Sequence, residues 1–135
     1  MNVKNIALCY VAGTVGGFAN SVVLWLSGML GITAALGVKL APAFTAAWLY
    51  PRLVWGGLWG FLFLLPFLVD RLYLKGLLLS LAPSAVQLFF IFPEVVDKGI
   101  LGLSLGTLTP AFVLLFNAIW GLTTAGLLVR LNGSQ

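Results

Sequence analysis

The chain has 135 residues, of which 61% are hydrophobic and 7% are charged, with a formal net charge of +4 and a mean hydropathy of +1.13. Soluble domains carry about 25% charged residues, and a chain this small could not hide so many apolar side chains from water. The seven basic residues stand at the ends of apolar segments and form no patch with aromatic residues, which argues against nucleic-acid binding and is typical of membrane anchoring.

The first expected membrane span covers about residues 6–30. It is longer than the apolar region of a signal peptide and has no small-residue cleavage site, so we expect it to be retained. Gly13, Gly17 and Ser21 recur at a spacing of four within it, and small residues at this spacing let a second helix approach closely in lipid. We expect these three residues to pack against another helix of the same chain; a dimer interface is the alternative.

Three further spans are expected. A Gly- and Ala-rich stretch over residues 31–41 is too short to cross a membrane, and Pro42 is predicted to open the second span, because proline suits the first helical turn. That span would reach about Val69. The third is expected over about residues 72–93, with Pro83 as a kink, and the fourth from Thr109 to about Arg130.

Two segments of the chain resemble each other in order and spacing. The match pairs Gly28–Thr33 with Gly99–Ser104, Pro42–Phe44 with Pro110–Phe112, Gly13 with Gly76, and Trp55-Gly56 with Trp120-Gly121. Each copy would hold two spans, so both copies would insert in the same orientation, related by a pseudo-twofold axis along the membrane normal. Chance similarity between apolar sequences built from few residue types is the alternative.

The predicted fold class is therefore all-α. We expect a polytopic membrane protein with four transmembrane helices, arranged as two parallel-repeat helical hairpins whose links are broken by Gly and Pro. Residues 1–135 would form a single integral membrane domain, with the first repeat at about residues 6–69 and the second at about residues 72–131.

The two links are irregular but still apolar, and such backbone cannot face lipid with free peptide groups. We expect the links to be covered by neighbouring protein, beside the N-termini of the helices that follow them. Helix N-termini attract anions, so this region is a candidate site for an anion or a lipid headgroup. The candidate residues are Lys39, Arg52, Lys98 and Thr109, the last also expected to cap the final helix. Packed loops without a ligand are the alternative.

Three amide side chains lie inside the expected spans: Asn20, Gln87 and Asn117. An amide in lipid needs a hydrogen-bond partner, so each is expected either to bond another helix or to line a polar lane through the bundle.

The chain lacks the groups that catalysis and metal binding require. It has no histidine, one cysteine and three acids (Asp70, Glu94 and Asp97), all in expected loops. Histidine and cysteine are the commonest metal ligands, and intramembrane carboxylates serve proton-coupled transport. We therefore expect no catalytic residues, no metal, no cofactor and no enzymatic activity.

The expected function is that of an accessory or scaffolding subunit, packed against membrane lipid and against other membrane proteins or copies of itself. The alternative is a homo-oligomeric pore or facilitator for a small neutral or anionic solute. Four spans would place both termini on one side, with four basic residues against three on the other. This balance predicts cytoplasmic termini in a bacterial-type inner membrane.

Overall fold

A computed structural model describes residues 2–132, and this part of the chain contains helices and no strands. The elements in order are α1 (Val3–Met29), α2 (Ile32–Ala35), α3 (Ala46–Gly60), η1 (Phe61–Leu64), α4 (Leu72–Leu79), α5 (Leu81–Val86), η2 (Gln87–Val95), η3 (Ile100–Gly102) and α6 (Thr109–Asn132).

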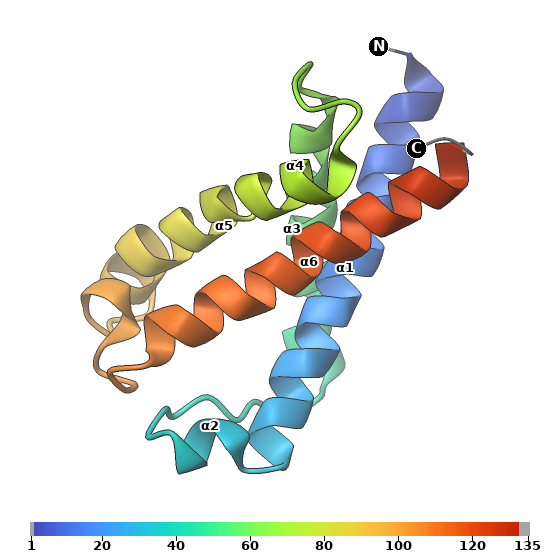
Figure 1. The fold of residues 1–135 in the computed structure, drawn as a ribbon. Helices are drawn as coiled ribbons and strands as arrows, with labels where there is room; N and C mark the ends of the chain where they lie inside the picture. The colour runs from blue at the N-terminus through green and yellow to red at the C-terminus, as the bar shows by residue number, and fades with distance from the viewer. Residues whose placement is uncertain (1, 133–135) are drawn as a thin grey trace.

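The helices form two hairpins that cross each other (Figure 1). In the first, α1 packs along α3; in the second, the run α4–α5–η2 packs along α6. The long helices α1 and α6 cross in the middle of the molecule, and the start of α1 lies at the same end as the end of α6 (Figure 1). The links that contain α2 and η3 lie away from that end.

Three helical runs in the described residues are long and apolar enough to cross a membrane: Val3–Met29, Leu72–Val95 and Thr109–Asn132. The second expected span corresponds to α3 with η1, which is shorter, and its crossing of the membrane stays a prediction.

The prediction that Pro42 opens the second span is wrong. Helix α3 begins at Ala46, because the Thr45 side chain accepts a hydrogen bond from the Trp48 N–H and caps the helix. The span also ends earlier than Val69. Regular structure stops at Leu64, just before Pro66, which has no N–H with which to continue a helix.

The third expected span is one helical run with two irregularities. It breaks at Ser80, three residues before Pro83, and its last part is a π-helix, Gln87–Val95, that contains Pro93. Proline removes a backbone donor and crowds the preceding turn, which accounts for both departures from the α-helical pattern.

Glycine allows the helices of each hairpin to touch backbone to backbone. A Cβ atom at Gly13 would strike the carbonyl oxygen of Gly56, and a Cβ atom at Gly76 would strike the carbonyl oxygen of Gly121. Where the hairpins cross, a Cβ atom at Gly16 would lie 2.7 Å from the carbonyl oxygen of Trp120. Side chains larger than hydrogen would force these helices apart.

The two links touch each other. The Lys39 N–H donates to the Leu105 carbonyl at 2.9 Å, and Gly106 lies against the backbone of Gly37. Within the first link, the Thr33 hydroxyl donates to the Leu40 carbonyl at 2.7 Å. Peptide groups of the irregular segments are thus bonded within the protein, as a membrane environment requires.

Candidate functional site

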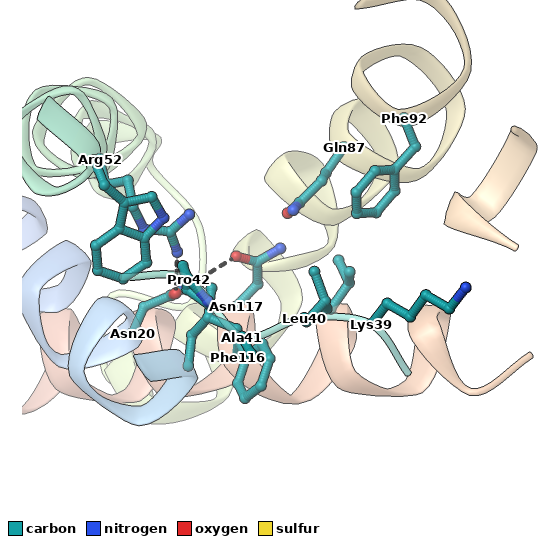
Figure 2. A pocket seen from close by; sticks show the side chains of 13 residues that line it. Asn20, Lys39, Leu40, Ala41, Pro42, Arg52, Gln87, Phe92, Phe116 and Asn117 are labelled. Atoms are coloured by element: carbon teal, nitrogen blue, oxygen red, sulfur yellow. Dashed lines mark hydrogen bonds between the residues drawn. The ribbon is translucent and has the colours of Figure 1, made fainter. Parts of the chain in front are cut away.

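Polar side chains from five separate segments meet at the crossing of the hairpins. They line a cavity of about 350 Å³ together with apolar residues of α1, α3, α6 and the first link (Figure 2). The lining includes all three amides singled out by the sequence, Asn20, Gln87 and Asn117. It also includes two of the candidate cationic residues, Lys39 and Arg52.

A chain of hydrogen bonds runs across the helices at the floor of this cavity. Arg52 Nη2 donates to Asn20 Oδ1 at 2.7 Å, and Asn20 Nδ2 donates to Asn117 Oδ1 at 3.0 Å. Asn117 Nδ2 then donates to Ser84 Oγ at 3.0 Å, and the Ser84 hydroxyl donates to the Ser80 carbonyl. The chain joins α3, α1, α6 and α5, so it fixes the positions of the helices that surround Arg52.

Arg52 has more donors than the protein uses. Its Nε donates to Ser21 Oγ at 2.8 Å, and its guanidinium lies 4.9 Å from the centre of the Trp48 ring. Of the five N–H donors of an arginine, two are bonded here, which leaves three. The chain's three acids, Asp70, Glu94 and Asp97, line neither this cavity nor its neighbour.

Glycine at position 17 brings Arg52 into this place. A Cβ atom at Gly17 would lie 2.9 Å from the Arg52 carbonyl oxygen, so α3 can approach α1 this closely only because the side chain is missing. One turn further along α1, Ser21 and Asn20 are then within reach of the guanidinium. Gly13, Gly17 and Ser21 all lie on the face of α1 that meets α3.

Like the guanidinium of Arg52, the side-chain amide of Gln87 has hydrogen-bonding capacity that the protein does not use. Its amide makes no hydrogen bond within the described residues, it lines the cavity, and it points toward Arg52 and Asn117 (Figure 2). An amide with a free N–H₂ and a free carbonyl can bond either an anionic or a neutral polar group.

Three of the expected cationic or capping residues do not join Arg52. Lys39 lines the cavity, but its ammonium points away from the arginine (Figure 2). Lys98 is exposed and lines neither cavity around Arg52. Thr109 is fully buried against Gly102, with its hydroxyl unbonded, and its N–H donates to the Gly106 carbonyl, so it does not act as the expected cap.

A second cavity, of about 270 Å³, lies on the other side of the same polar residues. It shares Asn20, Arg52, Gln87 and Asn117 with the first and is otherwise mainly apolar. Its walls are Trp55, Trp59, Val86, Ile91 and Trp120, with Gly17, Gly56, Pro51 and Pro83. At its base, the Trp120 indole N–H is shared between the Gly13 and Gly56 carbonyls, 3.2 Å from each.

Sequence reasoning did not identify Ser84, Trp48 or Trp120 as parts of the site. Ser84 and Trp120 do belong to the segments that resemble each other, where they match Ser21 and Trp55. That correspondence was the available signal, because Ser21 accepts a bond from Arg52 of α3 and Ser84 accepts one from Asn117 of α6.

The polar side chains of the two cavities offer hydrogen-bond donors and acceptors to an anionic or polar group. Two cationic side chains, Arg52 and Lys39, and three amides line the cavities, and no group of His, Cys, Asp or Glu in residues 2–132 could hold a metal ion. Comparisons with protein-family models, curated proteins and solved structures find no match to this chain. Its function must therefore be argued from this geometry.

Proposed function

We propose that this chain is a non-enzymatic integral membrane protein that binds a small anionic group at Arg52, as the binding step of a facilitator. The observation that carries the proposal is an arginine inside the bundle with three free N–H donors and no acid in either cavity beside it. An ionisable side chain at such depth is costly and needs a partner, and an anion supplies charge-assisted hydrogen bonds.

The depth of the site supports the proposal. Asn20, which accepts a bond from Arg52, lies nine residues before the end of α1 at Met29, or about 14 Å along the helix. In a hydrocarbon core about 30 Å thick, that distance places the guanidinium inside the membrane, in the half on the side of the links. A ligand would therefore enter from that side.

We propose four membrane crossings, with α3 and η1 as the second. The fifteen residues of α3 and the four of η1 together span about 30 Å, which matches the hydrocarbon thickness. The Lys75 ammonium donates to the carbonyls of Phe63 and Leu65, which satisfies peptide groups where the span ends.

We also propose that the two hairpins are repeats. Two sets of equivalent contacts support this. Gly13 meets Gly56 as Gly76 meets Gly121. Arg52 and Asn117, each three residues before a Trp-Gly pair, donate to Ser21 and Ser84 respectively. The site would then lie between the two copies, where repeat proteins of the membrane commonly bind their substrates.

The orientation that we propose places the termini in the cytoplasm of a bacterial-type cell. Lys4, Arg71 and Arg130 are exposed at the terminal end, and Lys75 is buried and so does not count toward the loop charge. At the link end, two basic residues are exposed, Lys39 and Lys98. An excess of basic residues favours the cytoplasmic side.

The accessory or scaffolding role stays a second proposal, supported by the many apolar side chains that the described residues expose. The helix-packing face formed by Gly13, Gly17 and Ser21 no longer supports it, because α3 occupies that face within the same chain. Lipid would cover the remaining apolar surface as well as a protein partner would.

Anion binding can be tested by titrating the delipidated protein in non-ionic detergent with acetate or inorganic phosphate. Trp48 lies against Arg52, so tryptophan fluorescence should report binding. Replacing Arg52 with glutamine is expected to weaken binding roughly ten- to hundredfold, the value of hydrogen bonds to a charged group. The matched control is Arg71→Gln, which removes an exposed charge at the far end of the molecule. Equal affinities in the native protein and Arg52→Gln would refute the proposal.

A further inference from the structure

The two cavities beside Arg52 differ in chemistry but meet at the same side chains. The first contains Lys39 and the backbone of the first link, and the second has walls of tryptophan, valine and isoleucine. A ligand that fills both must have a polar anionic end and an apolar end, because unpaired polar groups are costly in an apolar cavity.

The two cavities follow each other along the helices in the same order as the headgroup and the acyl chain of a lipid in one leaflet. The first cavity is lined by Leu24 of α1 and by Leu40 of the link, on the side of the links. The second is lined by Gly17 of α1 and Trp59 of α3, further from the links and toward the middle of the spans. A headgroup at Arg52 would therefore face the link-side surface, and a chain would extend toward the membrane centre.

The second cavity is open to the surface that faces lipid. Two of its wall residues are exposed: Trp55 by 60% and Val86 by 38%. Helix α3 packs mainly on α1 and makes few contacts with α5 and η2, which form the opposite wall. An acyl chain in the bilayer could enter this opening sideways without crossing water, whereas a small hydrophilic anion could not.

We infer that the anionic group held at Arg52 is the headgroup of a membrane phospholipid, with one acyl chain in the cavity between α3 and α5–η2. The inference rests on the proposed anion binding and names its ligand class. The phosphate accepts from the free N–H donors of Arg52 and from Gln87, and the chain lies against Trp59, Val86 and Ile91. Charge complementarity selects an anionic headgroup over a zwitterionic one.

The test is lipid retention. Protein is reconstituted in bilayers with equal amounts of phosphatidylglycerol and phosphatidylcholine of identical chains, extracted in non-ionic detergent, and weighed by native mass spectrometry. We expect one phosphatidylglycerol per chain, favoured at least tenfold over phosphatidylcholine, and loss of that lipid in Arg52→Gln.

A second variant separates the chain from the headgroup. Val86→Trp fills the second cavity and is expected to lose the lipid while still binding acetate as the native protein does. Val54→Trp adds the same indole to an exposed valine of α3 outside both cavities and should retain the lipid.

The outcomes are distinguishable. Equal retention of the two lipids, or unchanged retention in Arg52→Gln, overturns the inference. Acetate binding without any retained lipid overturns the inference and leaves the proposed function standing. Absence of both acetate binding and retained lipid overturns the proposed function as well.

Discussion

Alanine in place of Gly121 is expected to destabilise the protein by roughly 1–3 kcal/mol or more, the usual cost of forcing atoms into a packed interior. The new Cβ atom would meet the carbonyl oxygen and the carbonyl carbon of Gly76, which are backbone atoms and cannot rotate away. Helices α4 and α6 would have to separate along their whole contact. The Gly121→Leu variant is expected not to fold.

The matched control for Gly121→Ala is Gly126→Ala, five residues further along α6. There, the nearest atom to an added Cβ is the Tyr73 hydroxyl oxygen at 3.3 Å, the far end of a movable side chain. Its free energy of unfolding should change by no more than about 0.5 kcal/mol. Unfolding by SDS from mild detergent micelles, followed by tryptophan fluorescence, measures both variants. Equal losses at the two positions would show that the Gly76–Gly121 contact does not hold the second hairpin together.

Glutamate in place of Gln87 is expected to weaken anion binding while raising thermal stability. Gln87 has no hydrogen-bond partner among the described residues, and its amide faces Arg52 across the cavity (Figure 2). A carboxylate of the same shape would pair with the guanidinium, satisfy its free donors and take the place of the ligand. We expect affinity for acetate to fall roughly ten- to hundredfold, and the thermal midpoint to rise because the half-buried Arg52 has gained a charged partner.

The Gln87→Leu variant isolates the effect of the charge. It removes the amide without supplying an anion, so affinity for acetate should fall only about two- to tenfold, the value of one neutral hydrogen bond. The thermal midpoint should not rise. A Gln87→Glu protein that binds acetate as the native one does would place Gln87 away from the bound anion, contrary to the geometry of the cavity.

The sequence was sufficient to predict an all-helical chain with membrane-spanning helices, and to single out the polar residues that meet at the crossing. Asn20, Gln87 and Asn117 were identifiable because amides in an apolar span need partners, and Arg52 was singled out as a candidate residue for an anion site. Which groups pair could not be predicted, since it depends on how the hairpins cross, and at that crossing Gly16 lies against the backbone of Trp120.

Local predictions failed where a competing contact was stronger than the local signal. Pro42 is a good first residue for a helix, but the Thr45 side chain caps the helix by accepting from the Trp48 N–H. Helix α3 therefore begins at Ala46. Thr109 precedes a proline, as a capping residue would, but it is already the first residue of α6, and its hydroxyl makes no hydrogen bond. Lys39 and Lys98 were predicted to lie in irregular links. The direction of a side chain in such a segment cannot be predicted, because the segment has no helical periodicity.

The central claim is that an anionic group binds at Arg52, and the most direct measurement locates that group. Crystals of the protein grown with bromoacetate can be examined by anomalous scattering at the bromine edge. We predict a bromine peak in the cavities lined by Arg52 and Gln87, with the carboxylate within hydrogen-bond distance of the guanidinium. A cavity without bromine, in crystals where Arg52 instead pairs with a carboxylate of the protein, would contradict the account.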